Sequence, residues 1–84
     1  MNDKIYELIK HIVLEFAEEK EAVVFDLIEG ETEKTIVIKA ASGDMGRIIG
    51  KQGRIAQSLR TIAKSIPNEG NKKYFIEIKD LVWF

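Results

Sequence analysis

The sequence has no cysteine, one proline and one histidine among its 84 residues. Without cysteine there are neither disulfides nor thiolate metal ligands, and a reducing compartment is allowed. No apolar run exceeds five residues, which argues against a membrane span or a secretory signal. We therefore expect a cytoplasmic protein without a membrane partner. The histidine, His11, has no second ligand or base near it in the sequence, so we expect no metal site.

The residues that are present indicate one folded domain spanning 1–84. The composition is 45% hydrophobic and 32% charged, and the length allows one modest core. The net charge is only −1, yet it is unevenly distributed along the chain. Residues 1–44 carry five lysines against eleven acidic residues, whereas residues 45–73 carry seven basic residues against one glutamate. This asymmetry predicts a basic face on an otherwise acidic domain.

Hydrophobic periodicity predicts the element order α-β-β-α-α-β. Apolar residues at helical spacing alternate with β-branched and aromatic segments, and polar turns separate them. The predicted helices cover 3–19, 45–49 and 54–66, and the predicted strands cover 22–28, 35–38 and 73–79. Ser42 or Asp44 is suited to cap the second helix. A strand reached through two helices usually lies parallel to its neighbour, so we expect an α+β fold with a mixed three-stranded sheet and three helices on one face.

The segment 46–54, Gly-Arg-Ile-Ile-Gly-Lys-Gln-Gly-Arg, lies in the basic third of the chain. Gly50 and Gly53 are three residues apart between two predicted helices. Glycine allows positive φ and leaves no Cβ to block a ligand, so this turn is suited to holding a phosphate beside a positive side chain. Neither a nucleotide-binding P-loop nor a membrane dimerisation motif fits the spacing and surroundings. A helix-turn-helix for DNA remains an alternative, with Arg54, Gln57 and Ser58 at the start of its second helix.

The Gly-x-x-Gly turn and its surroundings resemble the KH domain. Ile-Ile-Gly-Lys-Gln-Gly-Arg at 48–54 is similar to the KH signature Ile-Gly-x-x-Gly, with two helices flanking the loop and strands flanking the helices. The element order resembles the type II, prokaryotic arrangement, and essentially the whole chain resembles small stand-alone bacterial proteins made of one KH domain. The resemblance implies cytoplasmic binding of single-stranded RNA, in post-transcriptional regulation or a role like that of an RNA chaperone. It also implies a homodimer, or a heterodimer with a larger KH-containing protein.

Carried onto this sequence, the resemblance assigns the RNA-binding residues. The glycines would allow close approach of the RNA backbone, polar and basic side chains would contact phosphates, and an aliphatic groove would hold bases. The residues are Arg47, Ile49, Gly50, Lys51, Gln52, Gly53 and Arg54 around the loop, with Lys72 and Lys73 from the loop before the last strand. Ile38 and Ile76 are weaker groove candidates, Ile48 and Ile55 are expected in the core, and Arg60 and Lys64 on a solvated helix face.

Catalysis has little support in this sequence. There is no cysteine and no paired acid and base in a pocket-forming motif, so we expect neither an enzyme nor a cofactor nor a small-molecule substrate. The alternative of a different class is a KH-fold adaptor that mediates dimerisation or binds a larger RNA-binding partner, with little RNA affinity of its own. The apolar ending Leu81-Val82-Trp83-Phe84 packs on the domain or serves as an association surface.

Overall fold

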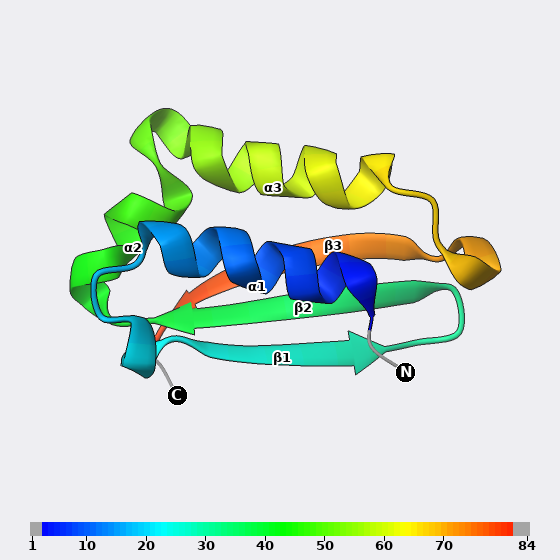
Figure 1. The fold of residues 1–84 in the computed structure, drawn as a ribbon, viewed down its shortest axis with the longest axis horizontal. Helices are drawn as coiled ribbons and strands as arrows, with labels where there is room; N and C mark the ends of the chain where they lie inside the picture. The colour runs from blue at the N-terminus through cyan, green and yellow to red at the C-terminus, as the bar shows by residue number, and fades with distance from the viewer. Residues whose placement is uncertain (1–2, 82–84) are drawn as a thin grey trace.

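The computed structural model describes residues 3–81 and has the predicted order of elements (Figure 1). The main elements are α1 (Lys4–Phe16), β1 (Val24–Glu29), β2 (Glu33–Ala40), α2 (Ser42–Ile49), α3 (Arg54–Ser65) and β3 (Lys73–Asp80). Short 3₁₀ turns lie between them: η1 (Lys20–Ala22), η2 (Lys51–Gly53) and η3 (Glu69–Asn71). None of the helices within this range is long and apolar enough to cross a membrane.

The sheet has the strand order β1-β2-β3, and β2 is its central strand. β1 pairs with β2 antiparallel, and β3 pairs with β2 parallel, so that Ile36 lies opposite both Leu27 and Ile76. The three helices cover one face of this sheet (Figure 1). The predicted α+β class, with a mixed three-stranded sheet and helices on one face, is confirmed.

The core lies between the helices and the covered face of the sheet. Its fully buried side chains come from every layer, with Ile9 from α1, Ile48 from α2 and Leu59 from α3 above Ile36 and Ile38 of β2. Ile76 of β3 is also buried. The proposal that Ile38 and Ile76 line a groove was therefore wrong, because both side chains are used in the core.

Helix α1 ends at Phe16, three residues earlier than the predicted end at 19. Ala17 is already extended and donates its N–H to the Val13 carbonyl. The next two N–H groups, of Glu18 and Glu19, donate to the two carboxylate oxygens of Asp44 at 3.0 and 2.9 Å. A distant carboxylate thus accepts the hydrogen bonds that would have continued the helix.

Helix α2 begins at Ser42, and neither predicted cap performs that role. Its N-cap is Ala41, which offers no side-chain hydrogen bond. Ser42 Oγ donates to Asp80 Oδ2 at 2.7 Å, which ties the start of α2 to the end of β3. Asp44 is buried with 1% exposure and faces the α1–β1 connection. The capping prediction was wrong because both side chains have longer-range partners.

The apolar ending of the chain lies only partly within the described range. Leu81 is half-buried, and its N–H donates to the Ala40 carbonyl at 2.9 Å, which extends the β2–β3 pairing by one bond. The expectation of a packed or associating tail rests mainly on residues 82–84, which lie outside the described residues.

Candidate functional site

The connection between α2 and α3 is a tight turn with three positive φ angles. Gly50 ends α2 with φ 82° and ψ 167°, Gln52 has φ 58°, and Gly53 precedes α3 with φ 74°. Two backbone bonds hold this path, from Gly50 N–H to the Gly46 carbonyl at 2.8 Å and from Gly53 N–H to the Gly50 carbonyl at 3.0 Å. Because glycine reaches positive φ without steric cost, the sequence encodes this turn locally.

The two glycines differ in what surrounds them. A Cβ on Gly50 would lie 2.6 to 2.8 Å from three atoms of Ile55, so Gly50 faces the protein. A Cβ on Gly53 would meet no atom within 4 Å, so Gly53 faces open space. Gly50 allows α2 and α3 to approach each other, and Gly53 leaves the outer surface of the turn open to a ligand.

The side chains of the turn project outward and are basic or polar. Lys51, Gln52 and Arg54 are all exposed, and Arg54 Nη2 donates to Gln52 Oε1 at 3.1 Å. Within residues 3–81, Lys51 forms no salt bridge. The turn therefore places two positive side chains and a glycine surface at the N-terminus of α3, a twelve-residue helix. Free N–H groups at a helix N-terminus attract anions, so this arrangement suits a phosphate.

Arg47 lies one turn before the loop, but its charge is already matched by acidic groups. Its Nη1 donates to the Gly43 carbonyl at 2.6 Å and to Asp44 Oδ1 at 3.2 Å, and its Nη2 donates to Glu18 Oε2 at 3.0 Å. The structure thus places Arg47 beside the loop as expected, but pairs it with two carboxylates and leaves it less charge to offer an anion.

The isoleucines around the turn divide between core and surface. Ile48 is buried with 1% exposure, and Ile55 packs against the core, as expected for both. Ile49 is half-buried and, in the described part of the chain, is not one of the hydrophobic residues that pack against the core. It remains a candidate for apolar contact beside the loop.

Lys72 and Lys73 are not brought to the loop. Helix α3, about 18 Å long from its helical rise, separates the loop from η3, which lies beside the β1–β2 turn at the opposite end of the molecule (Figure 1). Lys72 Nζ is 2.8 Å from Glu29 Oε2, and this hydrogen bond lowers the pKa of the Glu29 carboxyl. Lys73, at the start of β3, lies opposite Glu33 in the β2–β3 register. Both lysines lie at the far end of α3 from the glycine turn, and their part in RNA binding, from the loop before the last strand, stays a prediction.

Two residues near the site have structural roles that the sequence interpretation missed. Asp44 accepts two backbone N–H groups, and these bonds, from Glu18 and then Glu19, hold its pKa below the usual value of 3.8. The sequence signal was available, because Asp44 is four residues before Ile48 and shares its buried face of α2. Arg60 is not simply solvated, since its Nη2 donates to the Ile76 carbonyl of β3 at 3.1 Å.

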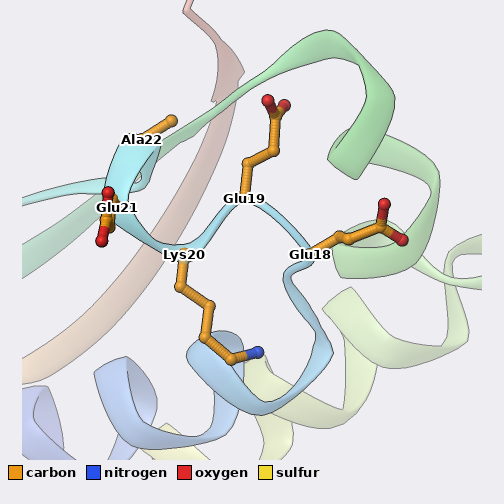
Figure 2. Close-up of a pocket in the computed structure, with 5 residues that line it drawn as sticks. All are labelled: Glu18, Glu19, Lys20, Glu21 and Ala22. Carbon is orange, nitrogen blue, oxygen red and sulfur yellow. The ribbon is translucent and has the colours of Figure 1, made fainter.

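Two hollows lie elsewhere on the surface. One is formed by residues 18–22 of the α1–β1 connection, where three of the five lining side chains are glutamates (Figure 2). Lys20 Nζ in this hollow donates to the Ala17 carbonyl at 2.6 Å. Among residues 3–81 there is no group of three or more acidic, histidine or cysteine side chains placed to hold a metal ion.

The second hollow lies at the start of α1, where Asp3 joins three elements. Its carboxylate accepts hydrogen bonds from Tyr6 N–H at 3.0 Å, Lys34 Nζ at 2.8 Å and Tyr74 Oη at 2.6 Å. Burial alone would raise the pKa of Asp3, but these hydrogen bonds outweigh it and hold the pKa below 3.8. The bond to Asp3 raises the pKa of Lys34. This cluster ties α1 to the sheet, and neither hollow includes a residue of the turn.

Comparison with known proteins gives one family. The model of the KhpA/KhpB KH domain matches residues 6–78. RNA-binding protein KhpA of Caldanaerobacter subterraneus subsp. tengcongensis is 40% identical over 72 residues, 86% of this chain and 96% of the relative. KhpA of Listeria monocytogenes is 40% identical over 72 residues, covering 86% and 95%. KhpA of Borreliella burgdorferi is 34% identical over 74 residues, covering 88% and 90%. No solved structure gives a significant match.

Proposed function

This chain belongs to the KhpA/KhpB KH-domain family, which is not an enzyme family, and on that premise we propose that it clamps the backbone of single-stranded RNA with Gly50 to Gly53. The relatives are named RNA-binding proteins. The observation that carries the proposal is the open surface of Gly53 between exposed Lys51 and Arg54 at the start of α3.

In the proposed complex, the phosphates lie against the turn. Gly53 admits the sugar-phosphate backbone without a Cβ in the way, and the N–H groups of the first turn of α3 face the anion. Lys51 and Arg54 supply charge, and Gln52 donates a hydrogen bond once its amide turns from Arg54 to the RNA. Arg47 supports the turn through its bond to Asp44. It adds to the positive electrostatic potential around the turn more than it contacts the RNA directly.

The bases would lie beside the turn, with Ile49 in apolar contact. No aromatic residue occurs between positions 45 and 73, so stacking of bases on rings is not expected there. With few groups to read base edges, we expect modest sequence preference and weak binding by a single domain. Such binding suits post-transcriptional regulation or a chaperone-like role on many RNAs.

For partners, the family suggests association of KH-containing chains. We propose that residues 1–84 act as one KH domain that pairs with a second copy or with a larger KH-containing protein. The competing function is an adaptor in which this pairing, and not RNA, is the main activity. It predicts a stable protein complex from a chain that shows no RNA binding.

An electrophoretic shift on a short single-stranded RNA at two salt concentrations tests the clamp. The variant Lys51→Asp with Gln52→Asp is expected to lose at least tenfold in affinity, because two carboxylates would face the phosphates. The control variant, Lys73→Asp with Asn71→Asp, makes the same charge change at the other end of α3 and is expected to lose far less. Equal binding by wild type and loop variant, or equal loss in both variants, would contradict the clamp.

A further inference from the structure

Glu18, Asp44 and Arg47 form a hydrogen-bonded cluster between the α1–β1 connection and helix α2. Asp44 is buried, and its Oδ1 accepts both the Glu18 N–H at 3.0 Å and Arg47 Nη1 at 3.2 Å. One carboxylate oxygen therefore holds the backbone of residue 18 and the guanidinium of residue 47. Arg47 Nη2 in turn donates to Glu18 Oε2 at 3.0 Å, which closes the cluster. The fold thus holds the two exposed charged side chains beside each other.

The two ends of the Arg47 guanidinium have different surroundings. Nη1 donates to the Gly43 carbonyl and to Asp44 Oδ1, and both acceptors belong to α2 itself. Nη2 donates to Glu18, which belongs to a separate segment and points toward α2 from the hollow at 18–22 (Figure 2). The Glu18 side chain is 73% exposed and the Arg47 side chain is 47% exposed, so this ion pair is open to solvent. The inner end of the guanidinium is fixed, and the outer end is accessible to an anion.

The outer end of Arg47 lies close to the proposed clamp. Arg47 is three residues before Gly50, a rise of about 4.5 Å along α2. The planar N–H groups of a guanidinium match the oxygens of a phosphate. An exposed ion pair contributes little free energy, so a phosphate can replace the Glu18 carboxylate at small cost. Arg47 therefore has one position for which a carboxylate of this chain and a phosphate of the RNA are alternatives.

We propose that Glu18 competes with an RNA phosphate for Nη2 of Arg47 and thereby limits the affinity of this chain for RNA. When the phosphate binds, the Glu18 carboxylate leaves Nη2, while Asp44 and Gly43 continue to hold Nη1. Arg47 is then a phosphate ligand that is already positioned beside the turn. The inference rests on the proposed clamp, which brings phosphates to the end of α2. It adds a second reason for the weak binding expected of one domain.

A comparison of two glutamates in the same connection tests the competition by RNA titration. Glu18→Gln is expected to raise RNA affinity about fivefold and to steepen the slope of log affinity against log salt by about 0.7, because one more phosphate contact forms. Glu21→Gln makes the same charge change, but within residues 3–81 Glu21 forms no salt bridge, and it lies at the opposite side of the hollow (Figure 2). Its affinity is expected to stay within twofold of wild type. Unchanged affinity in Glu18→Gln, or an equal gain in both variants, would overturn the proposal.

The gain in affinity is expected to require Arg47. Arg47→Gln in the wild-type background should lose only a small part of the affinity, because Glu18 already limits the contact. In the Glu18→Gln background, the same substitution should remove the whole gain. A gain that survives in the double variant would show that the Glu18 charge acts on the RNA at long range, and would overturn the proposal.

Carbon NMR of the unaltered protein observes the displacement without any substitution. Saturation with a short single-stranded RNA is expected to shift the side-chain carboxyl signal of Glu18, because this group loses its partner, and to leave that of Glu21 in place. The N–H signals of Gly50 and Gly53 in the same sample report on the clamp. Shifted glycine signals with an unshifted Glu18 carboxyl would overturn the competition alone, whereas unshifted glycine signals on bound RNA would contradict the clamp.

Discussion

Gly50 and Gly53 share positive φ but differ in their neighbours, and this difference separates folding from binding. Gly50 is enclosed by Ile55, whereas Gly53 has empty space where a side chain would stand. A residue change at Gly50 therefore acts on the contact between α2 and α3. A change at Gly53 acts on the backbone path and on the surface offered to a ligand.

Gly50→Ala is expected to destabilise the protein more than Gly53→Ala. At Gly50 the methyl group adds a clash with Ile55 to the unfavourable φ, for a total of about 3 kcal/mol. At Gly53 only the cost of φ applies, about 1 kcal/mol. Urea unfolding of the two variants and wild type measures both values. Equal losses would show that the Ile55 contact relaxes without cost.

Asp3, the N-cap residue of helix α1, connects that helix to two strands of the sheet. It caps Tyr6 N–H and accepts from Lys34 of β2 and Tyr74 of β3. Burial raises the pKa of the Tyr74 hydroxyl, and the hydrogen bond to Asp3 raises it further. The helix, the central strand and an edge strand thus depend on one ionised carboxylate.

The stability of the fold is expected to fall in acid through Asp3 and Asp44. The pKa of each carboxyl is lower in the folded chain than its usual value of 3.8. Each therefore adds stability that is complete above that value and is lost as the pH falls through the folded pKa. Asp3→Asn is expected to cost about 1–3 kcal/mol at pH 7 and to show a shallower loss in acid. Urea midpoints at pH 7 and pH 3 measure this, and parallel pH profiles of variant and wild type would contradict it.

The elements were predictable where the signal is local. Helical periodicity predicts α3 to within one residue at each end, and the spacing of the glycines predicts the turn before it. The end of α1 and the start of α2 were not predictable in this way, because Asp44, Ser42 and Asp80 are far from their partners in the sequence. Local pattern defines the elements, and long-range acceptors decide where they end.

The basic third of the sequence does not become one basic surface in the folded molecule. Arg47 is paired with acids, Arg60 donates to the Ile76 carbonyl, and Lys72 is bound to Glu29. Charge summed along a segment cannot reveal these pairings, which depend on the tertiary fold. The candidate site was thus predictable at the glycine turn, whose residues are contiguous, and was not predictable at Lys72 and Lys73.

The salt dependence of RNA affinity is expected to follow this placement. Lys51→Gln and Arg54→Gln should each reduce the slope of log affinity against log salt by about 0.7, because each removes one phosphate contact with a single strand. Lys73→Gln has the same effect on net charge but lies at the other end of α3, so its slope should match that of wild type. Titrations at four salt concentrations measure the slopes. A reduced slope for Lys73→Gln would extend the RNA path along the whole of α3.

The parallel pairing of β2 with β3 has a consequence for the growing chain. The glycine turn is synthesised before β3, yet Tyr74 and Ile76 of that strand complete the core under α3. The Ser42 hydroxyl and the Ala40 carbonyl also lack their partners, Asp80 and the Leu81 N–H, until the chain has been made to the end of β3. The turn is therefore synthesised before the strand that completes the fold around it. We expect nascent chains without β3 to leave RNA unbound.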